Sequence, residues 1–150
     1  MSIETNRALV LRFYELMSNL DFDAMFELMD DKGTWTVAGN PELFHHSGVA
    51  TKPQRIAALR DFTKFFASLQ QTVVSTTAED DRVAAHMTSR CETHSGLVYE
   101  NELLVLIRCA NGKIVSLYEH LDQATSLEFE KRLSAAAGIP VFATSVGATN

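Results

Sequence analysis

The order of apolar and polar residues predicts helices in the first part of the chain. Apolar side chains recur every three or four residues over 4–20, which is the spacing of one helix face. A short helix capped by Asp21 follows, and we expect Lys32-Gly33 to end it. A capping box that starts at Thr51 opens a third helix, whose apolar stripe runs as far as Leu69.

In the second part of the chain, apolar and polar residues alternate with the period of a strand. A short strand is expected over 34–37, whereas 42–50 has no clear period and is expected to be a loop. From Gln71 the apolar period changes to two. Asn111-Gly112 between two such runs is a strong hairpin signal, because both residues tolerate a positive φ. The expected long strands are 72–79, 82–93, 98–109 and 113–121.

A last helix is expected to begin at a second capping box, Thr125 to Glu128, and to end near Ala137-Gly138. We therefore expect a single domain over 1–137 and a C-terminal tail over 138–150. Helices followed by a meander indicate an α+β fold, in which a curved antiparallel sheet packs on the helices as a cone. The cone would enclose a cavity between sheet and helices, a common kind of ligand site.

Charge and composition exclude several kinds of partner. The 150 residues include 13 Lys and Arg against 19 Asp and Glu, a net charge of −6. We expect no binding to nucleic acid or to anionic membranes, since both require positive charge. No apolar run approaches the roughly 20 residues of a membrane span, and no leader sequence is recognisable. The protein is therefore expected to be cytoplasmic, with Cys91 and Cys109 as free, buried thiols.

Four segments carry a family resemblance. They are Trp-Thr-Val-Ala-Gly at 35–39, Gly-Leu-Val-Tyr-Glu-Asn-Glu at 96–102, Asn-Gly-Lys-Ile-Val at 111–115 and Tyr-Glu-His-Leu-Asp at 118–122. In this pattern the chain resembles the SnoaL-like, nuclear transport factor 2-like superfamily over about residues 7–124. That superfamily includes ketosteroid isomerases, polyketide cyclases and limonene epoxide hydrolase. The resemblance implies the cone fold, but this fold hosts unrelated chemistries and also non-enzymes.

The resemblance also allows the catalytic positions of one known mechanism to be compared, one by one, with the residues of this chain. Similarity to ketosteroid isomerases places Phe13, Val37 and Val105 at the positions of the catalytic Tyr, the general-base Asp and the protonated Asp. None of these side chains can give or take a proton. We therefore do not expect steroid isomerisation by that mechanism.

Similarity to limonene epoxide hydrolase places Met87, Ser89 and Glu119 at its charged triad, so only the last acid is retained. Glu119 is flanked on its own strand face by Leu117 and Leu121, and such burial raises the pKa of a carboxyl. A carboxyl tuned in this way can act as a general acid or base near neutral pH. Alternatively, Glu119 is a buried residue satisfied by a Tyr hydroxyl or an Asn amide, or the end of the strand is exposed to water.

Other polar groups are expected to face the same cavity. Tyr99 and Asn101 would hold a substrate oxygen or hydrogen-bond Glu119. His45 and His46 lie in the loop near the cavity mouth, where one imidazole could shuttle protons. This pair lacks a third ligand at a recognisable spacing, so neither a metal site nor a cofactor is expected. The expected catalytic residues are Glu119, His46 and Tyr99, and the expected ligand-binding residues are Trp35, Val37, His45, Phe62, Met87, Ser89, Asn101, Val105 and Leu117.

The opposite face of the sheet has an apolar centre at Leu104 and Leu106 and a charged rim. This mixture is typical of a protein interface, and we expect a homodimer through it, unless the C-terminal segment covers it. The sequence therefore favours an enzyme that transfers protons on a small, apolar, oxygen-containing substrate, as an isomerase, cyclase, dehydratase or hydrolase. The alternative is a non-catalytic ligand-binding or dimeric assembly module of the same fold.

Overall fold

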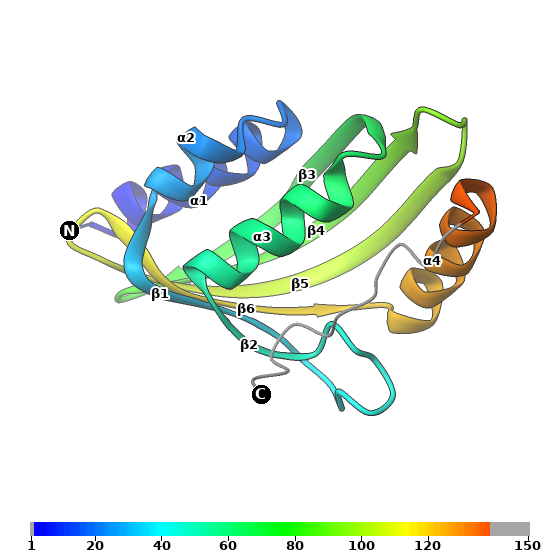
Figure 1. Ribbon diagram of the computed structural model, residues 1–150. Coiled ribbons are helices and arrows are strands. Elements are labelled where there is room, and N and C mark those ends of the chain that lie inside the picture. The colour runs from blue at the N-terminus through cyan, green and yellow to red at the C-terminus, as the bar shows by residue number, and fades with distance from the viewer. Residues whose placement is uncertain (1, 139–150) are drawn as a thin grey trace.

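The computed structural model describes residues 2–138, so the predicted tail lies, from residue 139 on, outside the described residues. Four helices and six strands follow one another along the described chain, as Figure 1 shows. In order they are α1 (Ile3–Ser18), α2 (Phe22–Glu27), β1 (Met29–Val37), β2 (Gly48–Thr51), α3 (Lys52–Thr63), β3 (Phe66–Glu79), β4 (Arg82–Thr93), β5 (Val98–Ala110), β6 (Lys113–Leu121) and α4 (Gln123–Ala137).

The strands form one curved sheet in the order β2-β1-β6-β5-β4-β3. α1, α2 and α3 lie over one face of this sheet, and α4 lies beyond one end (Figure 1). The α+β class and the curved sheet are confirmed. The sheet is mixed rather than purely antiparallel, because β6 returns beside β1 in the same direction. Pairing between strands far apart in sequence leaves no local signal, so the alternation did not reveal this parallel pair.

Two predicted helix starts are confirmed by their caps. The Asp21 side chain accepts a hydrogen bond from the Ala24 backbone at the start of α2. Thr51 and Gln54 form a reciprocal capping box at the start of α3. The predicted start of the last helix is wrong: α4 is capped by Asp122, whose carboxylate accepts from the backbone N–H of Thr125.

Two boundaries before the third helix differ from prediction. α2 ends at Glu27, so Lys32-Gly33 lies inside β1 and does not terminate a helix. Gly33 is needed there because a Cβ would stand 2.8 Å from the backbone oxygen of Asp30. The stretch expected to be a loop over 42–50 ends in the short strand β2 from Gly48.

The third helix is shorter than its apolar stripe predicted. α3 ends at Thr63, and Phe66 and Leu69 belong to β3. Both side chains are buried although they are an odd number of residues apart. The pairing of β3 with β4 shifts register between Phe66 and Ser68, and this bulge turns both residues inward. The three-residue spacing of Phe66 and Leu69, which predicted a helix, therefore results from a bulge in a strand.

The hairpins and the two faces of the sheet follow the predicted pattern. Asn111 and Gly112 have φ of 52° and 75°, as a tight two-residue turn requires. Met87, Val105 and Leu117 are buried on the inner face, under the helices. Cys91 and Cys109 are free and buried, as expected. Within residues 2–138, every helix is too short or too polar to cross a membrane.

Candidate functional site

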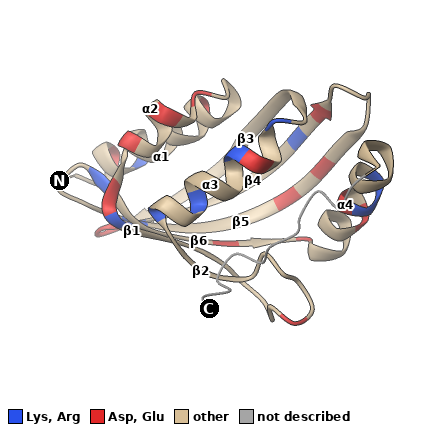
Figure 2. Cartoon of the chain, in the orientation of Figure 1, with Lys and Arg blue, Asp and Glu red and all other residues tan. Residues whose placement is uncertain are grey.

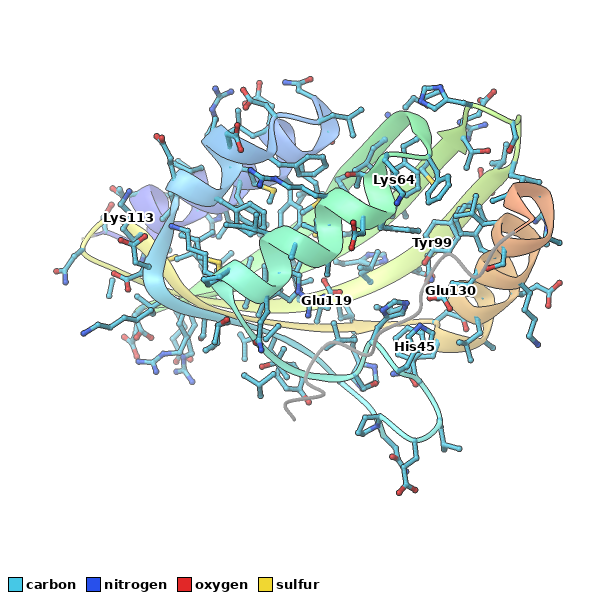
Figure 3. All side chains as sticks on the ribbon, in the orientation of Figure 1. His45, Lys64, Tyr99, Lys113, Glu119 and Glu130 are labelled. Atoms are coloured by element: carbon cyan, nitrogen blue, oxygen red, sulfur yellow. The ribbon has the colours of Figure 1, made fainter. Side chains whose placement is uncertain are left out.

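Glu119 lies on the inner face of the sheet, as its alternation predicts. Its neighbours across the sheet are Val37 on β1 and Val105 on β5. Figure 3 shows Glu119 in the space between β6 and α3. The residue is half-buried rather than sealed, so a carboxyl surrounded by apolar strand positions still has some surface open to a water-sized molecule.

The surroundings of Glu119 act on its ionisation in opposite directions. Burial raises the pKa of the Glu119 carboxyl above its ordinary value, and this is the largest effect. The charge of Arg55, the indole of Trp35 and the imidazole of His46 each act to lower it. The net pKa shift is upward, in the direction that the sequence predicts, so Glu119 holds its proton to a higher pH than an exposed carboxyl.

Arg55 is a buried cation beside this carboxyl. It projects from α3, along which several basic positions are spread (Figure 2). Its guanidinium lies 5.2 Å from the centre of the Trp35 ring and donates a hydrogen bond of 3.2 Å to the Trp35 carbonyl. Burial lowers the pKa of Arg55, while the charge of Glu119 raises it. The Nε atom is buried without a hydrogen-bond partner among the described residues.

Tyr14 supplies a second buried donor, from α1. Burial, with a smaller contribution from the charge of Glu119, holds its pKa well above the ordinary value, so the phenol stays neutral. Its hydroxyl has no hydrogen-bond partner in the part of the chain that the structure describes. The indole nitrogen of Trp35 is also buried and lies near Glu119 without reaching full hydrogen-bond geometry. We call Tyr14, Trp35, Arg55 and Glu119 the interior polar group.

His45 and His46 lie at the edge of this region, in the loop between β1 and β2. Both imidazoles face Glu130 of α4, and Figure 3 shows His45 and Glu130 beside each other. His46 is hydrogen-bonded to Glu130, and His45 Nε2 is 3.3 Å from the second carboxylate oxygen. The pKa of His45 is lowered mainly by burial and also by His46, against the opposite effect of Glu130. We call these three residues the His–Glu cluster.

The side-chain amide of Asn101 makes four hydrogen bonds within the protein. Its amide nitrogen donates to the Tyr99 hydroxyl at 2.5 Å and to the Asp122 carbonyl at 2.9 Å. Its amide oxygen accepts from the backbone N–H groups of Glu102 and Asp122. Asn101 therefore ties β5 to the start of α4, and its contact with a ligand stays a prediction.

Tyr99 lies between Asn101 and α4. Its ring packs 4.8 Å from the ring of Phe129, centre to centre. Burial raises the pKa of Tyr99, and the charge of Glu119 adds a smaller contribution in the same direction. The predicted catalytic Tyr99 is therefore within electrostatic range of Glu119, but its hydroxyl accepts a hydrogen bond from Asn101.

The other predicted ligand-binding residues divide into two sets. Trp35, Val37, Val105 and Leu117 are brought together around Glu119, with Trp35 paired to Leu117 across β1 and β6. The remaining set lies elsewhere in the core. Met87 is fully buried, Ser89 accepts a hydrogen bond from the Gln71 side chain, and the ring of Phe62 packs 4.5 Å from that of Phe66.

A pocket of about 560 Å³ lies away from Glu119. Its lining includes Ser89 and Asn101 but consists mainly of exposed residues on the outer face of β3, β4 and β5, such as Thr88, Arg90 and Glu102. Two of the predicted ligand-binding residues therefore border a groove on the side of the sheet opposite the interior polar group.

Comparison with known proteins places this architecture in a family. The family model of the SnoaL-like domain matches residues 10–117. The chain belongs to the SnoaL-like family. No curated protein matches the chain significantly. Among solved structures, PrhC from Penicillium brasilianum NBRC 6234 is similar, with a TM-score of 0.83 and 16% identity over 93% of this chain and 94% of that one.

Two further structures show the same fold. BvnE pinacolase from Penicillium brevicompactum has a TM-score of 0.77 and 19% identity, over 89% of this chain and 97% of its own. An NTF2-like protein of unknown function from Burkholderia pseudomallei K96243 has a TM-score of 0.72 and 19% identity, over 85% and 97% of the two chains. The predicted superfamily and cone-like fold are therefore confirmed.

Three polar residues of this SnoaL-like chain were missed by sequence reasoning. Arg55 shares a helix face with Leu59 and Phe62, at spacings of four and seven, and Glu130 lies between the buried Phe129 and Leu133. A charge on an apolar helix face was the available signal in both cases. Tyr14 was hidden because a tyrosine in an apolar stripe is an ordinary core residue.

Proposed function

We propose that this SnoaL-like protein is an enzyme that transfers a proton on a small, apolar substrate bearing a carbonyl or enol oxygen. The observation that carries the proposal is the interior polar group. A half-buried carboxyl with a raised pKa lies within electrostatic range of two buried donors, Tyr14 and Arg55, that have atoms without protein partners among the described residues.

Each residue has a chemical part in the proposed reaction. Glu119 takes a proton from the substrate and returns it at another atom, which requires a pKa closer to neutrality than that of an exposed carboxyl. The Tyr14 hydroxyl and the Arg55 guanidinium stabilise negative charge that develops on the substrate oxygen. The apolar residues Val37, Val105 and Leu117 favour an apolar substrate body.

The pinacolase name of BvnE, a structure with the same fold, supports an enzymatic role without defining this substrate. The departures from the ketosteroid isomerase and epoxide hydrolase positions leave the isomerase, cyclase, dehydratase and hydrolase outcomes open. A non-catalytic ligand-binding protein remains the alternative, and it needs no proton transfer.

Proton transfer can be measured before the natural substrate is known. The wild-type protein is incubated in D2O with a panel of small apolar ketones, and exchange of their α hydrogens is followed by NMR. We expect exchange in at least one ketone, and a loss of about 100-fold or more in the Glu119→Gln variant. Glu128→Gln, which changes an exposed carboxyl on α4, is the matched control. Equal exchange by wild type and Glu119→Gln, or no exchange with any ketone, would overturn the proposal.

We also propose that two copies pair through the outer sheet face. Leu104, Leu106 and Tyr118 are 63%, 44% and 49% exposed there, and they adjoin one another across β5 and β6. Leu104→Glu should convert a dimer into a monomer, as measured by light scattering coupled to size-exclusion chromatography. Val49→Glu, at an exposed apolar residue of β2, is the control. A monomeric wild-type protein would contradict this proposal.

A further inference from the structure

We propose that His45, His46 and Glu130 bind a divalent transition-metal ion, and that Zn²⁺ suits the set best. The site is separate from the proton transfer proposed for Glu119 and does not depend on it. Two imidazoles and a carboxylate are borderline ligands that zinc accepts, and sets of two His and one Glu occur at zinc sites with an open position.

The three side chains converge from two distant parts of the chain. One ligand atom from each residue lies within 4.8 Å of the other two. Ligands about 2.0–2.1 Å from a tetrahedral ion stand about 3.3 Å from one another. The separation of 3.3 Å between His45 Nε2 and Glu130 Oε2 matches that value. An ion would bind His45 and Glu130 near their present positions, and it would replace the hydrogen bond between His46 and Glu130.

The side chains of the His–Glu cluster are more buried than those of an ion pair at the surface, and this burial favours a bound ion. The Glu130 side chain is only 11% exposed, whereas the His45 and His46 side chains are 30% and 20% exposed. The carboxylate is thus held in place while the imidazoles leave a path for the ion. Phe44 packs its ring 5.1 Å from that of His46 and limits water on one side.

The charges nearby also fit a dication. Two neutral imidazoles and one carboxylate would carry a single negative charge when they bind an ion. This charge offsets half of that of a divalent ion, and a water or a ligand oxygen would complete its coordination. The bound ion would join the β1–β2 loop to α4.

A second His–Glu pair in the same protein provides a comparison. His86 and Glu102 are hydrogen-bonded on the outer sheet face, where their side chains are 35% and 70% exposed. That pair has no second imidazole within the same ligand set, among the residues that the structure describes. It therefore serves as a matched control for binding by one histidine and one carboxylate.

Metal binding is tested on the full chain without an affinity tag. Protein stripped with EDTA and dialysed is titrated with Zn²⁺ by calorimetry and with Co²⁺ by visible absorption. We expect one equivalent to bind, with affinity weakened by more than about tenfold in Glu130→Gln and in His46→Ala. His86→Ala should bind as the wild type does. Zn²⁺ should raise the Tm of the wild type more than that of Glu130→Gln at the same metal concentration.

X-ray absorption of the Zn²⁺-loaded wild type keeps the test independent of any variant that fails to fold. Nitrogen and oxygen neighbours at about 2.0–2.1 Å are expected, without sulfur. Absence of stoichiometric binding, sulfur in the first coordination shell, or undiminished binding by both cluster variants would each overturn the proposal. Deuterium exchange by the EDTA-treated protein shows separately whether the Glu119 chemistry holds.

Discussion

Replacing Glu119 with glutamine should change how the stability of the protein depends on pH. Burial raises the pKa of the folded carboxyl above its value in the unfolded chain, which is about 4.3. Below that unfolded value both states hold the proton, so the contribution of Glu119 to stability is fully present. As the pH rises further, the unfolded chain releases its proton first and the contribution is progressively lost.

The size of this loss follows from linkage. Between the unfolded and the folded pKa of Glu119, the free energy of unfolding falls by up to about 1.4 kcal/mol per pH unit. Arg55 from α3, His46 from the β1–β2 loop and Tyr14 and Tyr99 from α1 and β5 interact with the carboxyl. The favourable charge of Arg55 reduces the rise in the pKa of Glu119 without cancelling it. Each pKa unit by which the folded value still exceeds the unfolded value therefore removes a sizeable part of a free energy of unfolding of about 5–15 kcal/mol.

The assay is urea denaturation of the metal-free wild type and of Glu119→Gln over a series of pH values. Glutamine does not titrate, so the stability of the variant relative to wild type should increase as the pH rises from about 4.3 and level off above the folded pKa. Glu128→Gln should follow the wild type in its pH dependence. A constant difference between wild type and Glu119→Gln across the whole range would refute the proposed burial of this carboxyl.

Two substitutions and one labelling experiment test the packing and the cap of α4. Met87→Ala should cost about 2–5 kcal/mol in urea denaturation, because Met87 is fully buried; a loss below about 1 kcal/mol would contradict that packing. Asp122→Ala should cost about 1 kcal/mol, since it removes the cap that accepts from Thr125, and an unchanged midpoint would show that the cap is dispensable. Burial raises the pKa of the Cys91 thiol to about 12, so it should react with a thiol reagent only after unfolding, and rapid labelling of the native protein would be inconsistent with this.

Local signals accounted for much of the fold. The capping box at Thr51 and the Asn111-Gly112 turn are set by residues a few positions apart, so the sequence alone placed them. The parallel pair of β1 and β6 and the bulge after Phe66 depend on which strands meet in space. No periodicity within one segment contains that information.

The sequence likewise predicted only some of the residues of the candidate site. Alternation along β6 placed Glu119 on the inner face beside apolar neighbours, and the structure has it there. Arg55, whose charge acts on Glu119, comes from α3, and Glu130 on α4 lies 84 residues further along the chain than His46. Such meetings require the tertiary fold, because no fixed spacing in the sequence links these residues.

The most direct test of the interior polar group is a crystal structure with a small apolar phenol or ketone bound. Its oxygen should lie within hydrogen-bond distance of the Tyr14 hydroxyl or the Arg55 guanidinium, with the apolar body against Val105 and Leu117 and with Glu119 beside the ligand. Electron density for the ligand confined to the outer-face pocket, or an interior packed solid around Glu119, would contradict a catalytic role for this carboxyl.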